Sequence, residues 1–167
     1  FETIGKFKVV ANIPYYITTP LIFRLLEARE YLQSMTLTTQ KEVAERIAAG
    51  PGGKDYGVLT IMIQYFAQAE LMFIIPKEAF RPVPKVDSAV VHMEILEQPR
   101  VMVRDEKILF RLVRTAFSQR RKTLSNSLKG ISDNIKDVLL QSGIDPQRRP
   151  ETLSLEEFAT LSDHLAN

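Results

Sequence analysis

The sequence predicts an α/β fold that is followed by a small all-α part. Strand-like and helix-like runs alternate up to about residue 99, and only helix-like runs follow. Apolar residues make up 45% of the chain, which is ordinary for a globular protein that buries a core. We therefore expect an α/β domain over residues 1–99 and a helical domain over residues 100–167.

The first strand and the first helix are marked by their stop and start signals. The apolar run at residues 7–11 predicts a short buried strand, which Asn12 and Pro14 stop. Thr19 is a favoured residue before a helix, and Pro20 is favoured at the first helical position. A helix is therefore expected to begin there.

The rest of the α/β part alternates in the same way. Apolar and polar residues alternate at 34–39, which predicts a strand, and a helical pattern follows from about Gln40. The Gly-rich stretch 50–57 is a loop by composition, and residues 58–67 are expected to form a buried helix. Two further strands are expected at residues 70–75 and 86–96.

Helical spacing dominates after Pro99. The apolar residues of the first predicted helix recur three and four positions apart, as on the buried face of a helix. They are Ile108, Leu109, Leu112, Val113, Ala116 and Phe117. Shorter helices are expected at residues 123–129, 134–142 and 154–166.

The net charge of +2 conceals a strongly basic block. Residues 1–99 hold 10 Lys/Arg and 11 Asp/Glu, residues 100–129 hold 9 and 2, and residues 130–167 hold 3 and 7. A block of net charge +7 between flanks of −1 and −4 suits a polyanion such as RNA. A solvated helix face is the alternative that the charge pattern leaves open.

Composition excludes several classes of protein. The chain has no cysteine, which excludes disulfides and thiolate metal sites and fits a reducing, cytoplasmic compartment. No run approaches the roughly 18 apolar residues of a membrane span, and the first residues lack the pattern of a signal peptide. His92 and His164 are isolated from carboxylates, so no metal site is expected. Because the chain does not begin with Met, we expect it to be part of a longer protein.

The segment Asn12-Ile13-Pro14-Tyr15 follows the first predicted strand directly. Open α/β sheets bind ligands at the carboxyl ends of their strands, which is where this tetrad falls. The Asn12 side chain and the Ile13 carbonyl can accept the two N–H bonds of a purine amine, while Pro14 stiffens the backbone. Tyr15 offers a flat face for stacking. A turn with a packed tyrosine is the alternative.

A second motif, at residues 80–85, lies in a loop that two prolines stiffen. Phe80 could form the opposite wall of a base pocket, where stacking on an aromatic ring contributes roughly 1–3 kcal/mol per base. Arg81 and Lys85 could bind phosphates. The alternative is a loop before a strand, with Phe80 in the core.

The predicted basic helix ends in three consecutive cations, Arg120, Arg121 and Lys122, and already carries Arg111 and Arg114. We expect these five side chains to bind RNA phosphates. Cations also favour the carboxyl ends of helices because of the helix dipole, which is the structural alternative.

These segments together resemble one family, the small-subunit ribosomal RNA adenine dimethyltransferases. The resemblance covers nearly the whole chain, and its specificity comes from the order and spacing of the segments. They are Asn12–Pro20, Gln40–Arg46, Lys54–Gly57, Phe80–Ala89, Phe117–Leu124 and Arg149–Ser154.

The resemblance implies the second half of a Rossmann-like methyltransferase sheet, followed by a helical RNA-binding domain. It implies an enzyme that transfers methyl groups from S-adenosylmethionine to N6 of adenines in small-subunit rRNA during ribosome biogenesis. An extruded adenine would occupy the pocket, with its N6 held by Asn12 and the Ile13 carbonyl and its ring between Tyr15 and Phe80. Asn12 would also border the cofactor. The implied partners are small-subunit rRNA and its precursor particle, without a metal.

The chain departs from the family because it lacks the Gly-rich turn after the first strand and the acidic residue that grips the cofactor ribose. Its Gly cluster, Gly50–Gly53, follows a predicted helix and contains Pro51. We therefore expect most of the S-adenosylmethionine site to lie outside these residues, and the chain alone to be inactive. We also expect self-association through an open edge at strand 7–11.

Two other functions remain open at this point. One is a large-subunit rRNA adenine methyltransferase that confers antibiotic resistance, and the other is a non-catalytic RNA-binding or transcription-factor relative. The cations at 120–122 and the tail Arg149-Pro150-Glu151 favour the small-subunit enzyme over the first.

Overall fold

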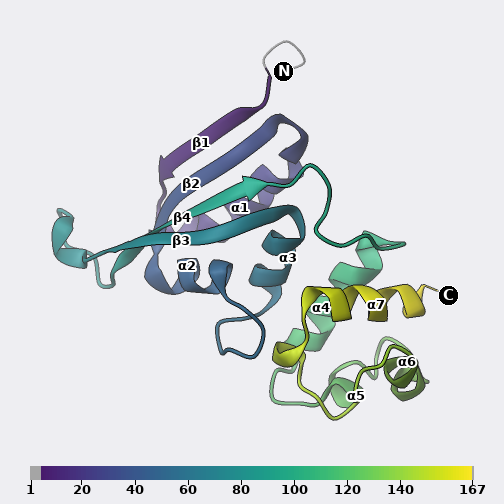
Figure 1. The fold of residues 1–167 in the computed structure, drawn as a ribbon. Coiled ribbons are helices and arrows are strands. Elements are labelled where there is room, and N and C mark those ends of the chain that lie inside the picture. The colour runs from purple at the N-terminus through teal and green to yellow at the C-terminus, as the bar shows by residue number, and fades with distance from the viewer. Residues whose placement is uncertain (1–4, 167) are drawn as a thin grey trace. The chain divides into compact units, whose positions relative to one another are not determined.

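The structure is a computed structural model that describes residues 5–166 (Figure 1). The chain divides into two compact units. The first, which we call the sheet unit, comprises the residues up to Ala49 together with Phe66–Arg100. The second, the helical unit, comprises Gly50–Tyr65 and the residues from Val101 onward. The predicted mixed α/β architecture is confirmed.

The sheet unit contains one four-stranded mixed sheet in the order β1-β2-β4-β3. Its strands are β1 (Phe7–Asn12), β2 (Leu32–Gln40), β3 (Ala67–Ile75) and β4 (Ser88–Ile95). β1 runs parallel to β2, so the connection between them crosses over through a helix, α1 (Thr18–Glu27). β4 runs antiparallel to both of its neighbours. The short α2 (Lys41–Ala48) follows β2.

One face of the sheet is apolar and covered by helices. In β2 the alternate residues Met35, Leu37 and Thr39 are fully buried, whereas Thr36 and Thr38 between them are partly exposed. Both α1 and α2 contact β2, and α2 also contacts β3 and β4. The buried set belongs to the helix-covered face, since the Thr39 hydroxyl donates to the Thr18 hydroxyl of α1 at 3.1 Å. The alternation of apolar and polar residues that predicted this strand therefore also shows which of its faces packs against the helices.

β1 corrects the expectation of a buried strand. No residue of β1 is buried, and Val10 is 81% exposed. The reason is its place in the sheet, because among the described residues β1 pairs only with β2 and its other edge stays open. At an open edge of the sheet, an apolar run need not be buried.

The helical unit is built around one long amphipathic helix. Its helices are α3 (Val58–Phe66, of which Phe66 belongs to the sheet unit), α4 (Glu106–Ser118), α5 (Leu124–Ser127), α6 (Ile135–Gln141) and α7 (Leu155–Leu165). The apolar positions predicted for α4 are buried from Leu109 to Phe117, and α4 packs against α5 and α7. None of the helices within residues 5–166 is long and apolar enough to span a membrane.

Residues 50–65 lie in the helical unit, which differs from the predicted division at residue 99. The rings of two buried tyrosines explain the difference. Tyr56 meets Phe117 edge-on at 6.2 Å between ring centroids, and Tyr65 meets Phe110 at 5.3 Å. The Tyr65 hydroxyl also donates to a Glu106 carboxylate oxygen at 3.1 Å. From its position in the sequence, this segment was expected in the α/β domain. The packing of its aromatic rings against α4 makes it part of the helical unit instead.

The start of α7 is held by a cluster around Glu157. Ser154 and Glu157 form a capping box, in which the Glu157 amide donates to the Ser154 hydroxyl and the Ser154 amide to the Glu157 carboxylate. Arg148 donates to both oxygens of the same carboxylate and, at 2.6 Å, to the Thr152 carbonyl. The hydrogen bonds from Arg148 hold the pKa of Glu157 below its ordinary value, although partial burial acts in the opposite direction.

The Glu157→Gln variant tests this cluster through the pH dependence of stability. A carboxyl group with a lowered pKa stabilises the fold above its unfolded-state pKa, and the contribution is lost as the pH falls through the folded-state pKa. We expect urea unfolding to show a clear loss of stability for Glu157→Gln at pH 7 and a much smaller difference at pH 3. A difference that is the same at both pH values would contradict the assignment.

The open edge of β1 generates a second prediction. An exposed edge strand with an apolar side chain is a template for pairing with another chain, and a lysine at such a position opposes pairing. We predict that the 167-residue chain self-associates with rising concentration and that Val10→Lys shifts it toward the monomer in sedimentation velocity. The control is Leu140→Lys, at a 63% exposed position of α6, which should not change the association. A wild-type chain that stays monomeric would overturn the prediction.

Candidate active site

The structure brings the two predicted pocket motifs together at the carboxyl end of β1. A cavity of about 350 Å³ opens there between the residues that follow β1 and the loop that joins β3 to β4. Its lining residues are Asn12, Ile13, Pro14, Tyr15, Phe80, Arg81, Pro82 and Pro84. The two motifs lie far apart in the sequence, and they meet because the β3–β4 hairpin and β1 end on the same side of the sheet (Figure 1).

Ile13 anchors the first wall of the cavity. Its side chain is 6% exposed, and its amide donates to the Thr38 carbonyl of β2 at 3.4 Å, extending the β1–β2 pairing by one residue. Asn12, the residue before it, is exposed, and its side chain has no hydrogen-bond partner in the part of the chain that the structure describes. The side-chain amide of Asn12 is therefore available to a ligand at the rim of the cavity.

Tyr15 is held by a residue that the sequence analysis did not single out. The Tyr15 hydroxyl and the Ser88 hydroxyl lie 2.7 Å apart in a hydrogen bond, and Ser88 is fully buried at the start of β4. The Tyr15 ring belongs to a single-turn helix, Tyr15–Ile17, whose turn is closed by the Ile17 amide donating to the Pro14 carbonyl at 3.1 Å. The ring orientation is thus fixed at both the backbone and the hydroxyl.

The opposite wall is the loop that carries Phe80. Phe80 is half-buried, and its amide donates to the Lys77 carbonyl at 3.2 Å. The peptide bond between Arg81 and Pro82 is cis. The Arg81 guanidinium turns back onto its own loop, where one nitrogen donates to the carbonyls of Glu78 and Phe80, each at 3.1 Å. Arg81 therefore shapes the loop while it lines the cavity.

Lys85 lies apart from this cavity. It lines a second hollow, of about 450 Å³, at the start of α2. The other lining residues are Gln40, Lys41, Glu42, Glu45, Lys77, Val86 and Asp87. Three lysines and three carboxylates meet there, so the hollow has no net charge of its own.

The geometry of the first cavity suits a flat heteroaromatic ring with an exocyclic amine. Two aromatic residues, Tyr15 and Phe80, and one residue with a side-chain amide, Asn12, line a volume large enough for a base. An amide oxygen accepts an N–H bond without offering a charge. The expectation that His92 is isolated from carboxylates is wrong, because its Nε2 atom lies 3.3 Å from a Glu94 carboxylate oxygen two positions along β4. In residues 5–166 no group of three or more His, Asp or Glu side chains could hold a metal ion.

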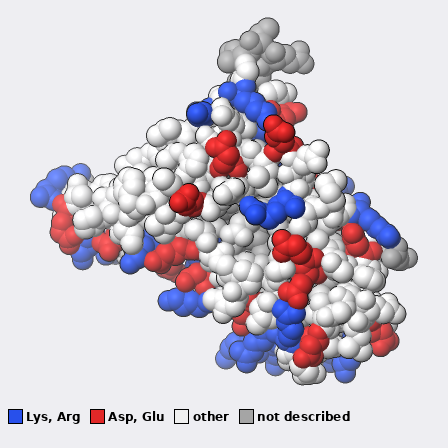
Figure 2. All heavy atoms as spheres, viewed as in Figure 1, with Lys and Arg blue, Asp and Glu red and all other residues white. Residues whose placement is uncertain are grey.

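The predicted cations of the helical unit do not form one uniform surface. Arg111 and Arg114 are exposed on α4, where a guanidinium nitrogen of Arg114 lies 3.9 Å from the Met62 sulfur. Arg121 and Lys122, beyond the end of α4, are exposed, and their side chains make no hydrogen bond or ion pair with any described residue. Figure 2 shows Lys and Arg side chains gathered over the segment that joins α4 to α5.

Arg120 differs from these neighbours. One of its guanidinium nitrogens donates to the Lys54 carbonyl at 2.7 Å and to the Tyr56 carbonyl at 3.1 Å. The guanidinium also lies 5.8 Å from the centroid of the Phe117 ring. One guanidinium nitrogen of Arg120 is thus directed at the chain itself, a role that charge patterning could not reveal.

Comparisons with known proteins support one family. Ribosomal RNA small subunit methyltransferase A of Clostridium acetobutylicum is 48% identical over 161 residues, which cover 95% of this chain and 58% of that protein. The enzyme of the same name from Geobacillus kaustophilus is 50% identical over 165 residues, covering 95% of this chain and 56% of that protein. The chain thus spans about 58% of the length of the curated relative from Clostridium acetobutylicum.

Two solved structures resemble the chain in fold. A dimethyladenosine transferase from Plasmodium falciparum superposes with a TM-score of 0.76 at 29% identity, covering 95% of this chain and 66% of that one. The 23S rRNA methyltransferase ErmE superposes with a TM-score of 0.73 at 23% identity, covering 98% and 67%. The second likeness shows the fold alone.

The family model described as ribosomal RNA adenine dimethylase matches residues 1–167. The resemblance read from the order of the motifs is confirmed, and the chain belongs to the ribosomal RNA adenine dimethylase family.

Proposed function

We propose that the protein carrying this chain transfers methyl groups from S-adenosylmethionine to N6 of adenines in small-subunit rRNA, giving N6,N6-dimethyladenosine. The observation that carries the proposal is the cavity at the end of β1, where Asn12, Tyr15 and Phe80 meet. The names of the relatives from Clostridium and Geobacillus support the small subunit as the substrate.

The chemistry requires that a poor nucleophile be oriented. The lone pair of an aminopurine nitrogen is delocalised into the ring, so its two N–H bonds must be drawn out of the ring plane. We assign this role to two acceptors, the Asn12 side-chain oxygen and the Ile13 carbonyl. Positioning of this kind supplies much of the rate where the electrophile is already activated.

Tyr15 and Phe80 would hold the ring of the base. A base inside a helical stack cannot reach the cavity, so the adenine must be extruded. Stacking between aromatic side chains contributes roughly 1–3 kcal/mol per base, which offsets much of the unstacking. The bond between the Tyr15 hydroxyl and Ser88 keeps one of these walls in place without a ligand.

The described residues are better suited to bind the methyl acceptor, adenine, than the methyl donor, S-adenosylmethionine. When bound, S-adenosylmethionine supplies an electrophilic methyl group. Its usual site is a Gly-rich turn between a strand and a helix, whereas β1 of this chain continues into Asn12 and Ile13 and the cluster Gly50–Gly53 follows α2. Asn12 would border both ligands.

The fold and the partners complete the proposal. We assign the sheet unit to the second half of a Rossmann-like sheet, which the parallel β1–β2 pair and its crossover helix support. The helical unit would bind rRNA or its precursor particle, in the cytoplasm, where the ribosome is assembled. Its outward cations Arg111, Arg114, Arg121 and Lys122 would contact phosphates.

The Asn12→Ala variant tests the assignment of the pocket. In the protein that carries this chain, we expect methylation of unmethylated small-subunit rRNA to slow by about 100-fold or more, as when a preorganised hydrogen-bonding group is removed. Affinity for RNA, measured by filter binding, should stay within about a factor of two, because one neutral side chain is a small part of the interface. Gln141→Ala, an exposed amide on α6, is the control. Equal losses of turnover and affinity would make Asn12 a structural residue.

Binding of S-adenosylmethionine to the 167-residue chain tests whether most of the methyl-donor site lies outside these residues. A ligand raises the melting temperature only if it binds the folded state. We expect S-adenosylmethionine to leave the melting temperature of the chain unchanged at concentrations that saturate the relatives. A dose-dependent rise would place a sufficient cofactor site within these residues.

A further inference from the structure

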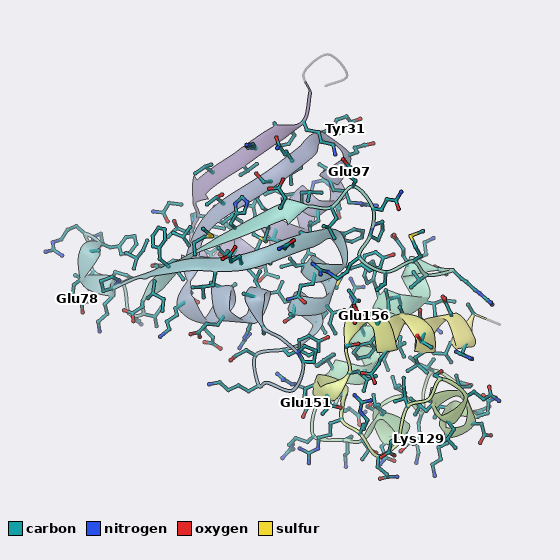
Figure 3. All side chains as sticks on the ribbon, in the orientation of Figure 1. Tyr31, Glu78, Glu97, Lys129, Glu151 and Glu156 are labelled. Carbon is teal, nitrogen blue, oxygen red and sulfur yellow. The ribbon has the colours of Figure 1, made fainter. Side chains whose placement is uncertain are left out.

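The loop at residues 50–57 contacts the rest of the helical unit at several points. The Gly52 amide donates to the Glu151 carbonyl at 2.7 Å, and Figure 3 places Glu151 beside this loop. The buried Tyr56 ring packs edge-on against Phe117. At its end the Gly57 amide donates to the Thr60 hydroxyl of α3 at 3.2 Å. These contacts make a glycine-rich loop part of the surface around the end of α4.

Arg120 supplies the contact in the middle of the loop. A guanidinium presents its donors in a rigid plane, and here one nitrogen bridges the carbonyls of Lys54 and Tyr56. An ammonium group on a flexible stem also has several donors, but it has no planar face to lie against an aromatic ring. The Phe117 ring under the guanidinium adds a cation–π contact that favours Arg at this position.

The bridge fixes the backbone of Lys54 beside the end of α4. The Lys54 side chain itself is exposed, and it has no hydrogen-bond or ion-pair partner within residues 5–166. Arg120 also lines a hollow of about 340 Å³ with Ser118, Gln119, Arg121 and Lys122. Lys54 therefore borders the basic segment in space, although 66 residues separate it from Arg120.

We propose that loop 50–57 is part of the RNA-binding surface, that Lys54 contacts an RNA phosphate, and that Arg120 is the positioning residue that holds the loop for this contact. The inference rests on the proposed RNA-binding function of the helical unit. It revises the prediction that Arg120 binds phosphate directly and adds a cation that the sequence analysis did not assign to RNA.

The first experiment examines the loop without RNA. In hydrogen–deuterium exchange, the Gly52 amide reports docking of the loop because it is hydrogen-bonded only when the loop is in place. Arg120→Ala should speed its exchange by about 10-fold or more, and Arg120→Lys should restore only part of the protection. Arg121→Ala is the matched control, because the side chain of this adjacent cation has no hydrogen-bond or ion-pair partner in the described part of the chain, and it should leave the exchange unchanged. Equal protection in wild type and Arg120→Ala would overturn the positioning role.

The second experiment measures the affinity of the 167-residue chain for unmethylated small-subunit rRNA as a function of salt. Each lost phosphate contact reduces the slope of log affinity against log salt by roughly 0.7–0.9. Lys54→Gln and Arg121→Gln should each produce this change, whereas Lys136→Gln, which removes an exposed cation on α6, should not. A slope for Lys54→Gln equal to that of wild type would overturn the Lys54 contact.

The double variant separates positioning from direct contact. If Arg120 acts by holding Lys54 in place, then Lys54→Gln should change the slope in the wild type but add little in the Arg120→Ala background. Fully additive changes would show that Arg120 binds phosphate by itself and would overturn the proposal. If the wild-type affinity does not depend on salt at all, the RNA-binding function fails and the Lys54 contact with it, while the exchange experiment still decides whether Arg120 holds the loop.

Discussion

Ser88, the first residue of β4, is the point on which the geometry of the sheet unit depends. It pairs with Gln40 at the end of β2 and with Ile75 at the end of β3, so three strands are brought into register there. Its buried hydroxyl bonds to Tyr15, which comes from the segment after β1. One small polar residue thus links all four strands with the cavity. A larger side chain would displace Tyr15, and an apolar one would leave the tyrosine hydroxyl without this partner.

This constraint explains why a cavity can form between two segments that are distant in sequence. The carboxyl end of β1 is held to β2 by the Ile13 amide, which donates to the Thr38 carbonyl. The β3–β4 loop is held by Arg81, which donates to carbonyls of its own loop. The sheet then needs only to hold two preformed walls at the right separation. Such preorganisation reduces the ordering that a ligand would otherwise impose on binding.

Much of the fold and of the pocket could be predicted because the signals are local. Period-two alternation located β2, helical spacing located α4, and the proline-rich segments around Pro14 and Pro82 marked the walls of the cavity. What could not be predicted depends on partners remote in sequence. The apolar run of β1 has the same local pattern whether its edge is covered or open. Arg120 has the same charge as Arg121, and only the carbonyls of Lys54 and Tyr56 distinguish them. Residues 50–65 follow α2 in the chain, but aromatic rings on α4 decide their unit.

The bridge made by Arg120 also bears on the order in which the chain assembles during synthesis. Most contacts at the start of α7 close short loops, since Arg148 and Glu157 are nine residues apart and Ser154 and Glu157 three. Contacts of this kind form early, because little chain entropy is lost in closing them. Loop 50–57, by contrast, is synthesised long before α4. Arg120, which bonds to it, lies 66 positions after Lys54. On the ribosome the loop therefore stays undocked until the end of α4 has emerged, and the buried Tyr56 finds its aromatic partner at the same late stage.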